Sequence, residues 1–245
     1  MGKSFQRFTG VLVAASAVAL AAAPAEAKKR RPTPPAPRVT APPVVIIPPR
    51  PYPPLGAPPS LTVPVVAADG VRETVNARLS PLQAVWNLRS AYNVAALNCR
   101  KPEHADILVG YRAFLKKHAR SLTAANRGVD ADFRARHGAA FVRPREAYMT
   151  RVYNYFAYPV TLNAFCDAAL AMSRASLVVP PTGLTAFSAA ELPKLEAVFD
   201  SFFRAYEQYR TDAANWDARY APRPAVVVPS ATPMVSLNPT STSRK

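Results

Sequence analysis

Proline sets the limits of what this chain can fold into. About half of its 27 prolines lie between residues 32 and 64, in the run PTPPAPRVTAPPVVIIPPRPYPPLGAPPSLTVP. Because proline fixes φ and has no backbone N–H, this run is incompatible with a helix or an interior strand. We expect residues 28–69 to form a basic, Pro-rich, extended linker of polyproline II conformation. A second segment, residues 222–245, is rich in Pro, Ser and Thr, and we predict a disordered C-terminal tail there.

The first residues have the pattern of a secretory signal peptide. Two basic residues precede an apolar run at 11–23, and an A-x-A cleavage pattern ends at Ala27. We predict that residues 1–27 are cleaved off and that the protein is periplasmic or secreted. An uncleaved membrane anchor is the alternative, but a helical span needs roughly 20 apolar residues. No later segment of the sequence is apolar over that length, so we expect no transmembrane span in the mature chain.

Residues 70–221 have the length of one ordinary domain, and their periodicity is helical. Ser80, Pro81 and Gln83 have the spacing of a helix N-cap, a first-turn proline and a capping box. Apolar residues then recur at intervals of three and four along one face as far as Cys99.

Later helices are predicted from the breaks between them. The predicted segments run from Pro102 to Asn126-Gly128, from Asp130 to Gly138, from about Pro144 to Pro159, from there to about Leu177, and onward from a second capping box at Ser188. Trp216 and Tyr220 are expected to close the bundle. With no strand pattern in between, we predict an all-α bundle of four to five helices.

The two cysteines, Cys99 and Cys166, both lie in the predicted domain. An even count in an oxidising compartment favours a disulfide that closes the bundle. Chain entropy gives such a bond roughly 4 kcal/mol. The alternatives are two free buried thiols or a redox pair, although catalytic pairs usually have the close C-x-x-C spacing.

A candidate polar pocket is predicted beside this cysteine joint. Arg89 and Asn93 are four residues apart and therefore share a helix face, and Asn154 comes from the segment that leads to Cys166. These side chains would bind an anionic or amide ligand. In the alternative interpretation they only satisfy buried polar groups across the joint.

A second candidate is an anion-binding patch of arginines around the predicted helix end at Gly138. Guanidinium groups suit anion recognition because they present paired donors. The alternative is a solvated basic turn. The members of the cluster are Arg134, Arg136, Arg143, Arg145 and Arg151.

No motif indicates catalysis, a metal or a cofactor. The three histidines lack the spacing of zinc ligands, and no G-x-S-x-G or S-x-x-K motif marks a nucleophile. The acidic residues near predicted helix starts suit the helix dipole, which accounts for them without a catalytic role. We therefore predict no metal site, no cofactor and no catalytic residue, and we lean towards a protein that is not an enzyme.

One pattern carries a resemblance. The spacing W-x-x-R-x-x-x-N-x-A-x-x-x-C from Trp86 to Cys99, together with Tyr153-Asn154 and Phe165-Cys166, resembles an uncharacterised family of exported, cysteine-paired helical proteins of alphaproteobacteria. The resemblance covers roughly residues 80–220. It implies export, helices and a cysteine pair, and it brings no catalytic residues.

The net charge indicates the partners. The formal charge is +16, and less than half of it falls within residues 70–221. We expect a non-enzymatic envelope protein whose basic arm binds anionic cell-wall or outer-membrane material, a membrane surface or an envelope protein. The alternative is a periplasmic small-ligand binder or enzyme with a polar site beside the Cys99–Cys166 joint. Specific nucleic-acid binding is disfavoured because no recognition motif is present.

Overall fold

The computed structural model describes residues 46–222. The signal peptide predicted at residues 1–27, the first part of the linker and the C-terminal tail from residue 223 lie outside the described residues. Six α-helices make up the described part: α1 (Pro81–Asn98), α2 (Asp106–Lys117), α3 (Ala119–His137), α4 (Val142–Phe156), α5 (Leu162–Ser176) and α6 (Leu184–Tyr220). Three short 3-10 turns and one isolated bridge between Val66 and Arg72 complete it. The predicted all-α fold is confirmed.

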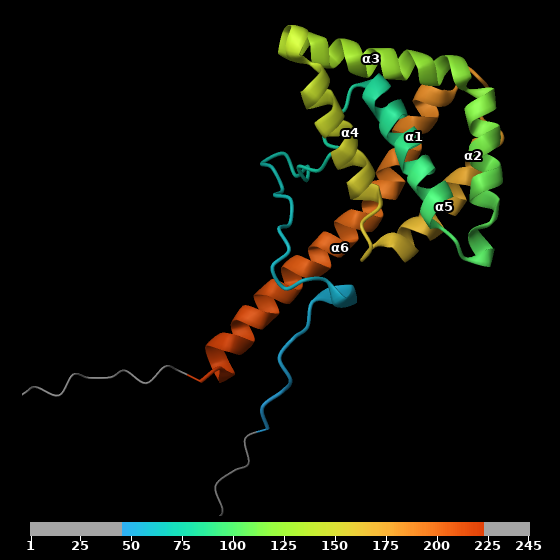
Figure 1. Ribbon diagram of the computed structural model, residues 1–245. Helices are drawn as coiled ribbons and strands as arrows, with labels where there is room; N and C mark the ends of the chain where they lie inside the picture. The colour runs from blue at the N-terminus through green and yellow to red at the C-terminus, as the bar shows by residue number, and fades with distance from the viewer. Residues whose placement is uncertain (1–45, 223–245) are drawn as a thin grey trace, which may run out of the picture. The chain divides into compact units, whose positions relative to one another are not determined.

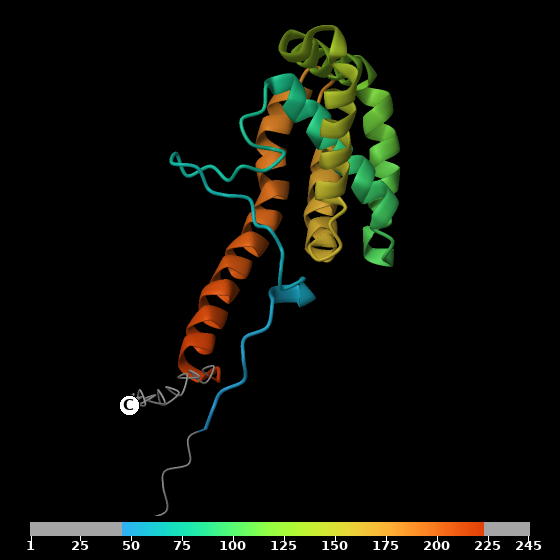
Figure 2. The ribbon, with the colours of Figure 1, turned by 60° about the vertical axis from the view of Figure 1, so that its left-hand side comes forward.

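Helix α1 is the centre of the bundle and contacts each of the other five helices (Figures 1 and 2). Its buried residues lie on nearly every side and include Leu88, Ala91, Tyr92 and Ala95, which have no exposed surface. A helix that is apolar all round is stable only when other elements enclose it. The sequence predicted that one face of this helix is buried, whereas the structure buries it on nearly every side.

The start of α1 follows the sequence prediction. The Ser80 hydroxyl accepts from the Gln83 backbone N–H at 3.3 Å, and the Gln83 side chain accepts from the Ser80 N–H at 3.0 Å. Pro81 occupies the first helical position, where a missing N–H leaves no gap in the hydrogen bonding. The predicted stops at Gly138, which has φ 58°, and at Pro159 are also confirmed.

The prediction of a break at Asn126-Gly128 was wrong. The chain breaks instead at His118, between α2 and α3, and α3 continues through Gly128. This glycine serves close packing, because a Cβ added there would lie 2.9 Å from the Cβ of Leu82 on α1. The predicted break is thus displaced to His118, and the described residues form six helices.

The predicted capping box at Ser188 was also wrong. Helix α6 begins four residues earlier, at Leu184, and the Ser188 hydroxyl donates to the Leu184 carbonyl at 2.9 Å inside the helix. Pro193 is accommodated within the same helix. As a result α6 is 37 residues long, and its C-terminal part extends beyond the other helices (Figures 1 and 2). Trp216 therefore lies on this extension and does not close the bundle.

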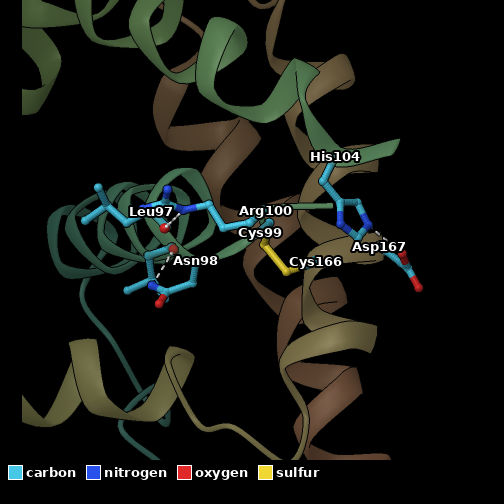
Figure 3. The surroundings of a disulfide bond; sticks show 8 residues. Leu97, Asn98, Cys99, Arg100, His104, Cys166 and Asp167 are labelled. Atoms are coloured by element: carbon cyan, nitrogen blue, oxygen red, sulfur yellow. Dashed lines mark hydrogen bonds and ion pairs between the residues drawn. A yellow bond between two sulfur atoms is a disulfide. The ribbon is translucent and has the colours of Figure 1, made fainter. Parts of the chain in front are cut away.

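The predicted disulfide between Cys99 and Cys166 is present and joins the end of α1 to α5 (Figure 3). The Cα atoms are 5.5 Å apart, and the sequence separation is 67 residues. Both cysteines are buried. None of the described helices is long and apolar enough to cross a lipid bilayer.

Candidate functional site

The part of the Pro-rich segment that the structure describes is packed on α6. We call residues 47–72 the docked arm. Ala57 is buried, the Leu61 N–H donates to the Tyr206 hydroxyl at 3.0 Å, and that hydroxyl donates to the Pro58 carbonyl at 2.7 Å. Proline-rich backbone has carbonyls that no helix or sheet satisfies, and a tyrosine hydroxyl can serve as both donor and acceptor for it. The described linker is therefore a fixed part of the domain.

Arg72 fastens the inner end of the docked arm. Its guanidinium donates to Asp200 at 2.9 Å, to both oxygens of Glu207 at 2.8 and 3.0 Å, and to the Pro64 carbonyl at 2.7 Å. The side chain is only 7% exposed, and it lies over the Phe203 ring. Hydrogen bonds from Arg72 hold the pKa of Glu207 below its ordinary value. Bidentate contacts of this kind combine charge with fixed geometry.

The outer end of the docked arm lies at the C-terminal tip of α6. Arg50 makes a bidentate pair with Asp217 at 2.8 and 2.7 Å, and Trp216 Nε1 donates to the Pro48 carbonyl at 2.7 Å. The Arg50 pair is exposed, so it contributes little to stability. The chain leaves the described region at residue 222, directly after α6. Both undescribed tails therefore join the domain at the same end.

A hydrogen-bond network joins the segment that follows the docked arm to the bundle. Glu196 of α6 accepts from Tyr155 at 2.8 Å and from Asn76 at 2.6 Å. Asn76 in turn accepts from Asn87 of α1 at 2.9 Å, and Asn87 accepts from Tyr148 of α4 at 2.7 Å. Asn87 has no exposed surface, so these bonds satisfy a polar group in the core.

Arg89 lines a separate cavity of about 310 Å³, which we call the Arg89 cavity. Its walls come from three helices: Trp86 and Arg89 of α1, Leu115 of α2, and Leu122, Thr123, Ala125 and Asn126 of α3. Figure 1 shows how α3 crosses above α1, with α2 and α4 on either side. Of the three residues predicted to form a polar pocket, only Arg89 lines this cavity.

Arg89 is half-buried and makes few polar contacts. Its guanidinium donates to the Tyr153 hydroxyl of α4 at 2.8 Å. Within residues 46–222 it has no carboxylate at salt-bridge distance. The Tyr153 ring lies edge-on to Trp86, with 6.0 Å between centroids. Four of the five guanidinium donor positions are thus open to other acceptors.

The other two predicted pocket residues lie elsewhere. Asn93 is half-buried, one turn along α1, close to the buried Tyr111 hydroxyl of α2. Asn154 is exposed and lines a different, apolar hollow of about 210 Å³ between α4, α6 and the docked arm. Arg89 is ten residues from Cys99, or about 15 Å of helical rise, so its cavity is not beside the disulfide.

The five arginines of the predicted patch do not act together. Arg145 is paired with Asp130 and Glu146, which offset its charge, and it also donates to the Asn126 side chain. Arg134 lies over the Phe141 ring, with 4.5 Å to its centroid.

The remaining three arginines are exposed. Arg136 lies over the Phe133 ring, 4.4 Å from its centroid, and Arg136 and Arg151 line one hollow of about 410 Å³. Glu73 lines the same hollow, so an anion there would meet a carboxylate. Arg143 lies apart from that hollow. The cluster is therefore a divided basic surface.

The buried histidines have structural surroundings. His104 Nε2 lies 2.8 Å from Asp167, next to the disulfide (Figure 3). His118 is enclosed at the joint between α2 and α3, and burial lowers its pKa. No group of three metal-ligating side chains occurs among the described residues.

Comparisons with known proteins add no relative: no family model matches the chain, and neither the curated proteins nor the solved structures contain a significant match.

Proposed function

We propose that the protein is a non-enzymatic component of the bacterial envelope, exported by its signal peptide. In this proposal the basic segment that precedes the docked arm binds anionic cell-wall or outer-membrane material. The helical domain is then presented as a binding module for an envelope partner. The proposal is supported by the sequence of the two tails and by the contacts of the described domain.

The observation that carries the proposal is that the described chain begins and ends at the same end of α6. Pro48 and Arg50 of the docked arm contact Trp216 and Asp217 at the end of α6. Both tails are therefore attached at one end of the domain, on a helix that extends beyond the bundle. A surface-bound segment attached there leaves the bundle free to meet a partner.

The described carboxylates support a structural role. Asp200 and Glu207 bind Arg72, and Glu196 binds Tyr155 and Asn76. General acid–base catalysis requires a titratable group within reach of a substrate. Asp200 and Glu207 are taken up by the docking of the arm, and Glu196 is taken up by α4 and by the segment that follows the arm.

The test is co-sedimentation of the chain from residue 28 with purified sacculi and with outer-membrane vesicles. The test variant replaces the basic run that opens the arm with glutamine, at Lys28, Lys29, Arg30 and Arg31. A matched control removes the same number of positive charges from exposed positions on α2 and α3, at Arg112, Lys116, Arg120 and Arg127. Every variant runs from residue 28 to residue 245, because cutting at residue 70 would strip the docked arm from α6.

Each basic residue near an anionic surface contributes up to about 1 kcal/mol, so four together change binding by well over tenfold. We expect the arm variant to bind at least about tenfold more weakly, and the control to keep most of its binding. Equal losses in the two variants would mean that net charge, and not the arm, determines binding, which contradicts the proposal.

A second candidate function, binding of a small ligand, is favoured by one observation, the Arg89 cavity. Binding of such a ligand does not depend on the tether.

A further inference from the structure

We propose that the Arg89 cavity binds the carboxylate group of a small, mostly apolar monoanion, with Arg89 as the residue that pairs with the carboxylate. The site is separate from the arm and from the disulfide, so this proposal and the envelope tether can each fail alone.

The charge balance of the cavity is the first argument. Arg89 is half-buried and lacks a carboxylate partner in the described part of the chain, and it is the one charged residue among those that line the cavity. A partly buried charge is unfavourable unless it is paired. A single guanidinium matches a single carboxylate, with which it can form two parallel hydrogen bonds. A dianion would keep an unpaired charge in the cavity.

The walls define the rest of the ligand. Trp86 and Ala125 are buried, and Leu115 and Leu122 are partly exposed, so the inner surface is apolar. Thr123 and Asn126 are exposed and place polar groups at the rim. A volume of about 310 Å³ is at the lower end of ordinary ligand sites. The cavity therefore suits a short aliphatic or one-ring aromatic acid.

The surroundings of Arg89 outside the cavity include Tyr111 of α2 and Tyr153 of α4. The Tyr111 hydroxyl is fully buried and has no hydrogen-bond partner among the described groups, which is rare in a folded protein. Burial raises the pKa of Tyr111, and the positive charge of Arg89 and the Asn93 side chain both oppose that rise. Neither Tyr111 nor Tyr153 lines the cavity, so Arg89 is the charged group there that pairs with the carboxylate.

The experiment uses Trp86 as the reporter. The chain has two tryptophans, and Trp216 lies far away on the α6 extension. In a Trp216→Phe background we would titrate hexanoate and benzoate and follow the fluorescence of Trp86. Hexanamide and benzamide are the uncharged matches, and phenyl phosphate is the dianionic one. Calorimetry on the chain with both tryptophans repeats the titration without the substitution.

Two further substitutions separate the site from its surroundings. Arg89→Gln should weaken carboxylate binding at least about tenfold. Arg89→Lys keeps the charge but loses the paired donors, so its affinity should lie between those of the wild type and of Arg89→Gln. Arg112→Gln removes the same charge from an exposed position on α2 and should change binding less than twofold. Far-UV circular dichroism checks that each variant is folded.

The expected result is saturable binding of at least one carboxylate with little response to its amide. The proposal is overturned if no carboxylate binds at concentrations up to about 10 mM, or if amides bind as well as acids. It is also overturned if Arg112→Gln weakens binding as much as Arg89→Gln, because the effect is then one of general charge.

Discussion

Replacement of Arg72 by methionine should release the docked arm while the bundle stays folded. Methionine keeps an unbranched apolar stem over Phe203 but removes the hydrogen bonds to Asp200, to Glu207 and to the Pro64 carbonyl. The bundle keeps its disulfide and its α1-centred core, neither of which involves Arg72.

The size of the effect follows from the exposure of the partners. Breaking a buried ion pair typically costs about 3–5 kcal/mol, because one charge remains buried without a partner. Here Arg72 is 7% exposed, but Asp200 and Glu207 are 24% and 44% exposed and regain water when the pair is lost. We therefore expect a loss of about 2–3 kcal/mol in the free energy of arm opening.

Hydrogen exchange measured by mass spectrometry tests this expectation. A loss of about 2–3 kcal/mol corresponds to roughly 30- to 150-fold faster exchange in a peptide that spans Leu61, whose N–H donates to Tyr206. Peptides from α1 around Tyr92 should change far less. Arg50→Met, at the exposed outer pair, is the matched control and should have a small effect. Unchanged exchange at Leu61, or equal acceleration in α1, would refute the idea that Arg72 holds a separately opening arm.

Three other predictions concern pH, packing and the disulfide. Arg72 lowers the pKa of Glu207 below 4.5 in the folded state. The stability from this pair is therefore present above pH 4.5 and is lost as the pH falls through the folded pKa. The difference in melting temperature between wild type and Arg72→Met should shrink between pH 7 and pH 3. Gly110→Ala should lower the free energy of unfolding in urea by about 2–3 kcal/mol, because the new Cβ would meet the Tyr92 hydroxyl at 2.5 Å and the Ser173 hydroxyl closer still. In a background of Tyr92→Phe and Ser173→Ala, which lacks both oxygens, the same alanine should cost less than about 1 kcal/mol. Reduction of the disulfide should lower the free energy of unfolding by about 4 kcal/mol, measured by urea unfolding with and without a reductant, and no change would contradict the chain-entropy argument.

Local signals in the sequence were sufficient for several parts of the fold. The capping box at Ser80, the stop at Gly138 and the break before Pro159 depend on neighbouring residues alone, and the structure confirms them. The break at His118 has no proline or glycine to mark it, so it could not be predicted. At Ser188 the sequence offered a cap, but α6 begins earlier and the serine bonds within the helix.

Features that depend on distant contacts were not predictable. Polyproline segments have no apolar periodicity, and the contacts that dock the arm join residues far apart in the sequence, as in the Tyr206–Pro58 bond. The Arg89 cavity was predicted only in part. Arg89 stood out beside Trp86 within one helix, whereas the α3 wall, which includes Asn126, depends on how the helices cross.

The most direct test of the account is to find where the protein is and in what form. The chain would be produced at a low level in a Gram-negative bacterium, the cells would be fractionated, and the intact mass of the protein would be measured in each fraction. The account predicts a chain that begins at Lys28, has its two cysteines oxidised, sediments with the envelope and is released by high salt. A full-length chain that begins at Met1 and stays in the cytoplasm would contradict it.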